Sequence, residues 1–320
     1  MLIVPEALIA DLVTPEDAYS AVEAVFAEMA RGGACNFPVI REALGEGRQY
    51  GFKSGLDRAG GVLGVKAGGY FPGNAARGIT NHQSVVALFD PESGRPTALV
   101  GGNLLTALRT AAASAIAIDR LARRDAKVLG MVGAGHQAQF QLRAAARVRA
   151  FERVVAWNLH PDMLPKLGAV AAELGLPFEA VDLPRLGAEA DVIVTITSSP
   201  AASLLDAHVR PGTHLSCMGT DTRGKQEVEP TLLARAAVFT DEVAQSVSIG
   251  EAQHAVAAGL IAETAITPLG DVLIGRHPGR TSADAITLFD GTGVGLQDLA
   301  VASRAVARAV ERGLATTVAI

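Results

Sequence analysis

The feature that most constrains the fold is a glycine loop at residues 133–138, between an apolar segment and a helical pattern. The apolar segment 128–132 runs directly into Gly-x-Gly-x-x-Ala, in which Gly133, Gly135 and Ala138 hold the fixed positions. The first glycine permits a tight turn, the second leaves room for a phosphate, and the small third residue lets the helix pack closely on its strand. The helix start offers unpaired N–H groups and the positive end of the helix dipole. Such a motif occurs by chance in chains rich in alanine and glycine, but its strand and helix context predicts a dinucleotide-binding unit.

Beyond residue 127, short apolar segments alternate with helical segments. The expected strands are residues 128–132, 153–157, 192–197, 214–218, 237–240 and 286–289. This alternation predicts an α/β protein with a Rossmann-type, doubly wound parallel sheet. We place the dinucleotide-binding domain at residues 123–295.

The first part of the chain has a different sequence pattern, which predicts an α+β domain. A helix begins after Thr14, with Pro15 in its first position, and ends at residues 31–33. Residues 36–101 consist of short apolar runs broken by glycine, which predict a mostly-β module with strands near 62–66 and 84–89. An alanine-rich helix over residues 106–123 follows. We assign residues 1–122 to this domain, with a C-terminal helix, within residues 296–320, that returns to it.

Composition excludes several classes of protein. The net charge of −5 argues against a general nucleic-acid surface. No apolar run reaches the roughly 18 residues of a membrane span. The N-terminal segment lacks the basic region of a signal peptide, so a signal peptide is not expected. Cys35 and Cys217 are interpreted as reduced thiols, and no Cys/His cluster has the spacing of a zinc site. We therefore expect a cytoplasmic protein with no metal and with no nucleic-acid or membrane partner.

Polar residues follow three of the expected strands, at the edge where doubly wound sheets bind ligands. Asn158 either bonds an adenosine ribose, which mildly favours NAD over NADP, or simply opens a turn. Thr197 and Ser198 either bond the nicotinamide ribose or form a Ser/Pro turn. Asp221, in a glycine-flanked loop, is placed either for acid–base chemistry or for capping a turn.

The first domain contributes four cations: Arg41, Lys53, Lys66 and Arg109. Lys66 ends an apolar run, and Arg109 lies among the small apolar residues of a helix. A lone charge in such surroundings is expensive to bury unless it is paired. A substrate carboxylate would pair with these cations, bidentately with arginine, and the chain's own acidic residues would do so equally well.

Together these motifs resemble the ornithine cyclodeaminase/mu-crystallin family, over nearly the whole chain. The specific ones are Leu108-Arg109-Thr110-Ala111 and Gly219-Thr220-Asp221-Thr222-Arg223-Gly224-Lys225, in this order. The others are Gly64-Val65-Lys66, residues 71–74, Asn81-His82-Gln83, residues 133–138, residues 289–293 and Gln297-Asp298.

The resemblance implies a homodimer built through the N-terminal domain, and chemistry at the Cα of a small amino or imino acid in a cleft between the domains. Carried over by position, Arg41, Lys66 and Arg109 would bind the substrate carboxylate, and Asp221 would be the general acid/base, with Lys66 as the second catalytic residue. The cofactor residues would be Gly133, Ala134, Gly135, His136, Gln137 and Gly219, beside Asn158, Thr197 and Ser198. Of His82, His136 and His160, we expect only His136 to be functional.

Two departures from the family bear on the substrate. Ornithine cyclodeaminases typically carry Val-Asn-Gly-His-Pro after the site lysine, whereas residues 67–72 here read Ala-Gly-Gly-Tyr-Phe-Pro. Relatives often have Met-Pro near the position of Lys53, which adds a cation to a pocket already rich in them. A second substrate carboxylate would neutralise Lys53, whereas the distal amine of ornithine would be repelled.

We therefore predict an NAD(P)H-dependent oxidoreductase that reduces a small α-imino acid to an L-amino acid, with NADH favoured and NADP not excluded. Reduction of iminosuccinate to L-aspartate fits best, with Asp221 or Lys66 supplying the proton on the imine nitrogen. One alternative is an ornithine-type cyclodeaminase or a dehydrogenase of a monocarboxylic amino acid. Another is a non-catalytic protein that binds a small molecule.

Overall fold

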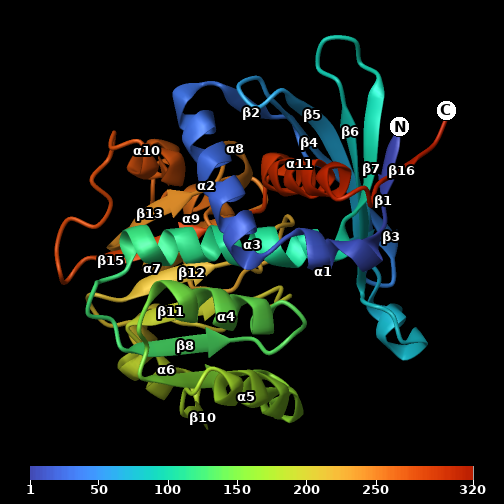
Figure 1. Cartoon of the computed structure of the whole chain (residues 1–320). Coiled ribbons are helices and arrows are strands. Elements are labelled where there is room, and N and C mark those ends of the chain that lie inside the picture. Colours follow the sequence, from blue (N-terminus) through green and yellow to red (C-terminus); the bar gives the residue numbers. More distant parts are fainter. Residues whose placement is uncertain (320) are drawn as a thin grey trace. The chain divides into compact units, whose positions relative to one another are not determined.

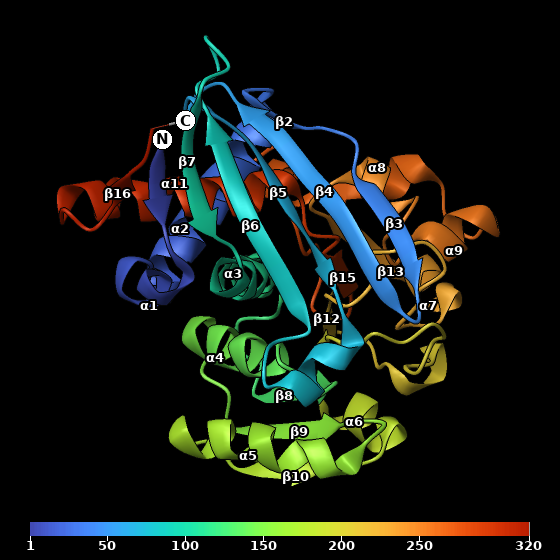
Figure 2. The same cartoon turned by 90° about the vertical axis from the view of Figure 1, so that its right-hand side faces the viewer.

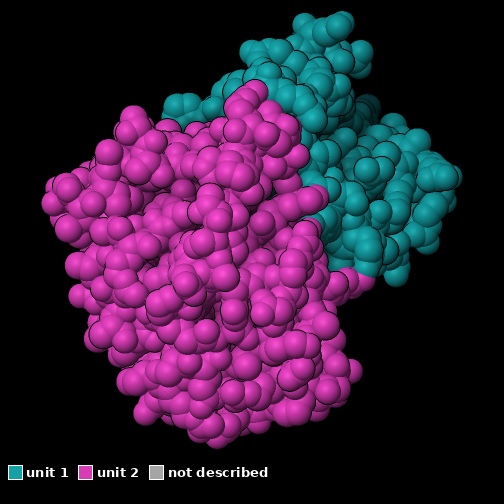
Figure 3. All heavy atoms as spheres, turned by 90° about the vertical axis from the view of Figure 1, so that its left-hand side faces the viewer, with its two compact units in different colours: residues 1–109, 294–320 teal, residues 110–293 magenta. Residues whose placement is uncertain are grey.

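A computed structural model describes residues 1–319, and the chain forms two compact units (Figure 3). Unit 1 comprises Met1–Arg109 and Val294–Ile320, and unit 2 comprises Thr110–Gly293. The division falls inside helix α3 (Asn103–Leu121), whereas the boundary expected from the sequence lies just after that helix. Unit 1 is therefore built from both ends of the chain, and unit 2 from one continuous segment.

Unit 2 contains an eight-stranded sheet whose paired strands are all parallel (Figure 1). Its strand order is β10-β9-β8-β11-β12-β15-β13-β14. The strands are β8 (Val128–Val132), β9 (Arg153–Trp157), β10 (Phe178–Ala180), β11 (Val192–Thr195), β12 (His214–Cys217), β13 (Ala236–Thr240), β14 (Thr267–Pro268) and β15 (Ile286–Asp290). Strands β9 and β10 lie on one side of β8, and all later strands lie on its other side, with β15 between β12 and β13. The predicted doubly wound parallel sheet is therefore confirmed.

Helices connect most of these strands. They are α4 (Ala138–Val148), α5 (Leu164–Glu173), α6 (Leu183–Glu189), α7 (Pro230–Arg235), α8 (Val243–Ser246), α9 (Gln253–Ala257) and α10 (Leu269–Leu273). Strands β8 and β9 have the bounds that the sequence predicts. Strand β11 ends two residues earlier than predicted, because the N–H of Thr197 donates to the Glu227 carboxylate instead of continuing the ladder.

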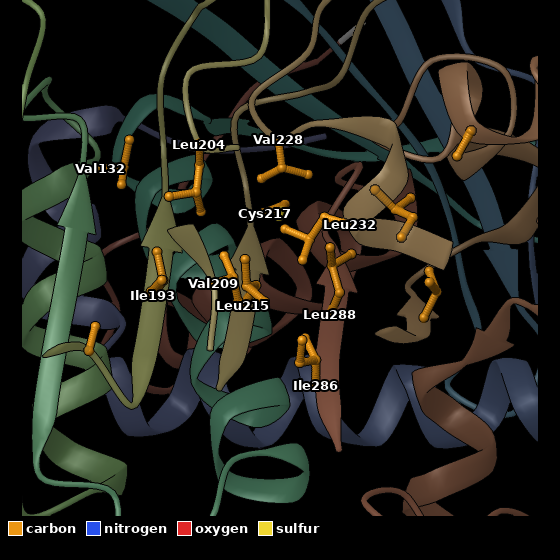
Figure 4. Close-up of a cluster of buried hydrophobic side chains, with 14 of the residues drawn as sticks. Val132, Ile193, Leu204, Val209, Leu215, Cys217, Val228, Leu232, Ile286 and Leu288 are labelled. Carbon is orange, nitrogen blue, oxygen red and sulfur yellow. The ribbon is translucent and has the colours of Figure 1, made fainter. Parts of the chain in front are cut away.

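The sheet of unit 2 packs on a cluster of buried aliphatic side chains (Figure 4). Ile193 of β11, Leu215 of β12 and Leu288 of β15 are fully buried in it, together with Leu204 and Leu232 from outside the sheet. Strands that are covered on both faces are buried along their whole length, and this holds for the apolar β11 as well as for His214 and Ser216 of β12, which are polar but fully buried. The core fixes the strand ends from which the polar loops begin.

Unit 1 contains a second sheet, of order β16-β1-β7-β6-β5-β4-β2, with β3 paired to β4. The strands are β1 (Leu2–Val4), β2 (Ala34–Asn36), β3 (Ile40–Gly45), β4 (Arg48–Asp57), β5 (Val62–Tyr70), β6 (His82–Phe89), β7 (Pro96–Gly101) and β16 (Thr316–Thr317). Its helices are α1 (Ile9–Leu12), α2 (Pro15–Arg31), α11 (Gly295–Glu311) and the first residues of α3. The predicted α+β character and the predicted cap of α2 are confirmed, because the Thr14 hydroxyl accepts the Asp17 N–H.

Helix α11 crosses one face of this sheet at close range. A Cβ atom at Gly64 of β5 would lie 2.7 Å from Leu299 Cδ2. A Cβ atom at Gly55 of β4 would lie 3.0 Å from Leu296 Cγ. Glycine in these strands therefore permits the close approach of the helix, which brings Asp298 onto the sheet face.

Three further observations concern the described part of the chain. No helix in it is both long and apolar enough to cross a bilayer. Within residues 1–319, no group of three or more His, Cys, Asp or Glu side chains is arranged to hold a metal ion. Cys35 is half-buried and Cys217 is buried, and both are free thiols.

Candidate active site

Four cations gather on the face of the unit 1 sheet that α11 crosses. Lys53 of β4 and Lys66 of β5 are directly paired across antiparallel strands, so their side chains leave the sheet on the same face. Arg41 of β3 pairs with Gly51, two residues before Lys53, and therefore shares that face. Arg109 of α3 lies close enough to Lys66 to perturb its pKa. We call Arg41, Lys53, Lys66 and Arg109 the cation cluster.

Asp298 of α11 is the carboxylate on which this cluster converges. Its Oδ1 atom accepts hydrogen bonds from Lys66 Nζ at 3.2 Å and from Arg109 Nε at 3.1 Å. Arg109 Nη1 also donates to Gln297 Oε1 at 3.0 Å. Asp298 is fully buried, and only 7% of Lys66 and 6% of Arg109 are exposed. Sequence reasoning gave neither Gln297 nor Asp298 a role, although both belong to the motifs that carry the family resemblance.

The crowding of these charges shifts their ionisation. Burial lowers the pKa of Lys66 to about 8, with Asp298 opposing the shift and Arg109 adding to it. Burial also opposes the ionisation of Asp298, but Arg109, Lys66 and Lys53 outweigh it and hold the pKa of that carboxyl below its usual value. Lys66 and Arg109 carry two positive charges and share the single negative charge of Asp298, on which the charge of Lys53 also acts. The remaining positive charge attracts anions, and a lysine that titrates near neutral pH suits proton transfer.

His82 is a further residue of this site, which the sequence analysis considered but gave no function. It begins β6 opposite Tyr70, which lies on the same face of β5 as Lys66. Burial, and after it the charge of Lys66, lowers the pKa of His82 to about 3, so the imidazole is neutral at physiological pH. A neutral imidazole can donate one hydrogen bond and accept another without adding charge. The alternation of faces along β6 is the signal that could have placed it here.

The glycine loop of unit 2 fits a bound pyrophosphate. Gly133 has a φ of +108°, a conformation that glycine adopts without strain. A methyl group on Gly135 would meet nothing within 4 Å, so open space borders the loop. Gln137 Oε1 is buried and has no hydrogen-bond partner within residues 1–319. The loop leads directly into α4, at the end of the helix that favours anions.

Asn158, which follows β9, braces this loop. Its Oδ1 atom accepts the N–H of Ala134 at 3.0 Å, and its Nδ2 atom donates to the His160 carbonyl at 2.8 Å. Both ends of the amide are thus bonded to backbone, as the turn interpretation predicts, and a contact with an adenosine ribose stays a prediction. His136 is exposed, with its ring 5.4 Å from that of Phe140.

The polar residues at the ends of β11 and β12 have a partner within the chain. The N–H and the hydroxyl of Thr197 both donate to Glu227 Oε1, at 2.6 and 2.8 Å. The N–H of Gly219 donates to Glu227 Oε2 at 2.7 Å. Ser198 is exposed in the same loop as Thr197. The predicted bonds of Thr197, Ser198 and Gly219 to a cofactor stay predictions, and Glu227 is a residue that sequence reasoning missed.

Asp221 lies in the loop that follows β12, with 30% of its side chain exposed. Its Oδ1 atom lies 3.0 Å from Lys225 Nζ and accepts the Thr222 hydroxyl at 3.2 Å. The structure thus gathers the predicted substrate-binding residues in unit 1. Asp221 and the predicted cofactor-binding residues lie in unit 2.

Comparison with known proteins assigns the chain to a family. The chain matches the model of the ornithine cyclodeaminase/mu-crystallin family over residues 6–313, and it belongs to that family. It is 63% identical to the iminosuccinate reductase of Paracoccus denitrificans over 321 residues, which cover 100% of both chains.

Solved structures of relatives agree with this assignment. The crystal structure of the iminosuccinate reductase of Paracoccus denitrificans in complex with NAD+ matches with a TM-score of 0.95 at 62% identity, covering 100% of this chain and 99% of that one. An archaeal alanine dehydrogenase dimer with bound NAD matches with a TM-score of 0.94 at 30% identity, covering 100% of this chain and 99% of that one.

Proposed function

We propose that this chain is an NADH-dependent imine reductase that converts iminosuccinate to L-aspartate. The observation that carries the proposal is the cation cluster, whose excess of positive charge over Asp298 suits a substrate with two carboxylates. The high identity to an iminosuccinate reductase along the whole chain supports the same substrate.

The arrangement of the cations separates two tasks. Lys66 and Arg109 are held together by Asp298, and with Arg41 they form the binding site we propose for the α-carboxylate. Lys53, paired directly with Lys66, lies beside them and is our candidate for the second carboxylate. An imino acid with one carboxylate would make no use of Lys53, whereas a second carboxylate would form a charge-assisted contact with it.

The loop from Gly133 to Gln137, braced by Asn158, is our candidate for the pyrophosphate site of NAD. The bound dinucleotide supplies the hydride for the imine carbon. Asn158 offers neither a cation for a 2′-phosphate nor a carboxylate for a ribose, and NAD is the cofactor bound to the iminosuccinate reductase and alanine dehydrogenase described above.

The chain's own residues orient the substrate and move a proton. Hydride addition to carbon is fast when the imine nitrogen is protonated, so a proton donor must stand by that nitrogen. With its pKa lowered to about 8, Lys66 is still protonated at neutral pH but gives up its proton more readily than an ordinary lysine. Asp221 is the alternative donor and the base that would accept the proton in the reverse direction. Surrounding the imine with protein groups also slows its hydrolysis.

An assay with freshly generated iminosuccinate tests this function. We expect stoichiometric loss of NADH absorbance with iminosuccinate, and little loss with pyruvate plus ammonia. Turnover with the pyruvate-derived imine instead would assign the chain to monocarboxylic imines. Ornithine breakdown without net NADH change would assign it to cyclodeamination, and NADH binding without turnover of any substrate would leave a binding protein.

We also propose that the chain forms a homodimer through the other face of the unit 1 sheet. In Figure 2, no helix of unit 1 lies over this face. It carries Ile40, Tyr50 and Phe52, which are 50%, 38% and 38% exposed. A solvent-exposed apolar face of this kind is typical of a protein interface, and in a symmetric dimer the same patch meets its own copy. The alanine dehydrogenase named above is likewise a dimer.

The mass in solution tests the dimer. We expect twice the chain mass by light scattering, and a shift toward the monomer for Phe52→Glu. Leu159→Glu, at a residue of unit 2 that is 72% exposed, is the matched control and should leave the mass unchanged. A wild-type monomer, or a dimer that Phe52→Glu leaves intact, would contradict this interface.

A further inference from the structure

Three buried carboxyl groups lie beside the C-terminal strand ends of unit 2, and none of them has a role in the proposed reaction. Glu227 and Asp290 are fully buried, and only 1% of Glu251 is exposed. Asp290 is the last residue of β15, while Glu227 and Glu251 lie in loops. We call these three residues the carboxyl cluster. Buried acids of this kind need an explanation, because burying a charge is unfavourable unless many donors compensate it.

Glu227 joins the ends of two adjacent strands. Its Oε1 atom accepts the N–H and the hydroxyl of Thr197, which follows β11, at 2.6 and 2.8 Å. Its Oε2 atom accepts the hydroxyl of Thr195 and the N–H of Gly219, which follows β12, both at 2.7 Å. One side chain thus receives four hydrogen bonds and fixes the loops after both strands.

Glu251 holds Glu227 and the start of the Asp221 loop in turn. Its Oε1 atom accepts the backbone N–H groups of Glu227 and Val228 at 2.9 and 2.8 Å. Its Oε2 atom accepts the hydroxyl of Thr220 at 2.5 Å. Because Thr220 directly precedes Asp221, both ends of the loop that carries Asp221 are attached to this pair of carboxyl groups.

A glycine at position 219 makes room for the Glu227 side chain. A Cβ atom on Gly219 would lie 2.2 Å from the carbonyl oxygen of Thr197 and 2.5 Å from Glu227 Oε1, and both distances are closer than real Cβ atoms come. Only glycine at this position lets the ends of the two strands approach each other and the carboxylate. The glycine of the Gly-x-Asp motif is therefore explained by the close approach of Thr197 and Glu227 together.

We propose that Glu227 is a positioning residue that holds the loops after β11 and β12 in the conformation that binds the nicotinamide half of the dinucleotide. This inference rests on the proposed function, because it takes the carboxyl edge of the sheet as the cofactor site. Glu227 acts through Thr197 and Gly219 and does not itself touch the reacting atoms. Glu251 acts one step further back, by fixing the backbone of Glu227.

A glutamine cannot replace Glu227 in this role. All four partners of Glu227 donate to it, and an amide has only one oxygen to receive them. The two hydroxyls can rotate to accept from the amide nitrogen, but a backbone N–H cannot. Glu227→Gln therefore leaves the N–H of Thr197 or that of Gly219 facing another N–H group.

The direct test is the dissociation constant of NADH, measured by fluorescence titration without any substrate. We expect Glu227→Gln to weaken NADH binding about tenfold, the effect of losing one hydrogen bond to a charged group. With substrate, kcat should fall while the KM for the imine changes little, since the substrate cations belong to unit 1. Thr195→Val removes one fully buried donor of Glu227 without touching a ligand, and should weaken NADH binding by about threefold.

Asp191→Asn is the matched control. Asp191 is also a mostly buried carboxylate of unit 2 that accepts backbone N–H groups, those of Lys127 and Val128, but it lies at the opposite edge of the sheet. The Asp191→Asn variant should have a lower melting temperature than the wild type and an unchanged NADH dissociation constant. Should Glu227→Gln fail to fold, Thr195→Val alone decides the matter.

Two results would overturn the proposal. The first is unchanged NADH affinity in Thr195→Val, or in a folded Glu227→Gln. The second is an equal loss of affinity in Asp191→Asn, because the effect would then follow general stability. If the wild-type chain binds NADH but does not reduce iminosuccinate, the proposed substrate fails while the affinity difference still tests Glu227.

Discussion

The cation cluster of unit 1 and the carboxyl cluster of unit 2 both bury groups of like charge, but they compensate them differently. Lys66 and Arg109 share one oppositely charged partner, Asp298, and positive charge is left over. Glu227 and Glu251 are instead surrounded by N–H and O–H donors, four for Glu227 alone. Donors compensate a carboxylate without adding an opposite charge, whereas one counterion shared by two cations leaves an excess for a ligand to neutralise. The first arrangement therefore suits binding, and the second suits holding a backbone in place.

The largest effect should come from Lys66→Met. We expect kcat/KM with iminosuccinate to fall about a thousandfold, since the variant loses both a carboxylate partner and a proton donor. The wild type should lose activity as the pH rises above 8, because the protonated form is the active one and its pKa is lowered to about 8. Initial rates of NADH oxidation against pH measure both effects. A flat pH profile of the wild type through pH 8 would contradict the role of Lys66. The NADH affinity of Lys66→Met should equal that of the wild type.

Asp298→Asn should have the next largest effect, on stability. Removing the shared partner leaves Lys66 and Arg109 buried without a counterion, and we expect a loss of about 3 kcal/mol in the free energy of unfolding. Urea denaturation measures this loss. Glu28→Gln breaks an exposed ion pair with Arg31 and should change the free energy by less than about 0.5 kcal/mol. Equal losses in both variants would remove the distinction between a shared buried counterion and a surface pair.

Lys53→Met should alter specificity more than stability. The KM for iminosuccinate should rise about thirtyfold, the effect of losing a charged contact to the second carboxylate. The KM for an imine with one carboxylate should stay the same or fall, since a buried like charge beside Lys66 has gone. Parallel kinetics with both imines measure the difference, with the exposed Lys127→Met as control. Unchanged kinetics with iminosuccinate would show that Lys53 does not bind a second carboxylate.

The smallest expected effect is that of the carboxyl cluster on how the free energy of unfolding changes with pH, and the sign of this change is distinctive. Burial raises the pKa of Asp290 to about 7 and, with the charge of Glu227, that of Glu251 to about 8. Between the ordinary carboxyl range and these values the folded state holds more protons than the unfolded state, so stability falls as the pH rises. We expect each of the two groups to contribute a fall of about 1 kcal/mol per pH unit between roughly pH 5 and 7. Asp290→Asn should flatten this slope in urea titrations, and an equal slope in both proteins would contradict the assignment.

The sequence predicts those parts of the molecule that depend on local pattern. Strand β8, the glycine loop and helix α4 follow from a periodicity that changes within a few residues. Lys66 and Arg109 of the cation cluster could be found because a charge among apolar residues needs a partner.

The partners themselves could not be predicted. Asp298 is 232 residues from Lys66 and 189 from Arg109, and no local pattern links them. Glu227 and Glu251 look like ordinary loop acids, because only the parallel sheet brings the ends of β11 and β12 to them. For Asn158 the sequence left a turn and a ribose contact open, and the bond to Ala134 shows how it fixes the loop. The roles of these residues depend on contacts with partners that are distant in the sequence.

Unit 1 is assembled from the first and last segments of the chain, and this has a consequence for how the protein is made. Domains generally fold as units while the ribosome is still adding residues. The whole of unit 2 has been synthesised when Gly293 is added, before α11 exists. Until residue 298 leaves the ribosome, Lys66 and Arg109 have no counterion to draw them together. The surface that we propose for substrate binding is therefore completed last, and a chain that stops short of α11 would contain every residue of the glycine loop but not the carboxylate that orders Lys66 and Arg109.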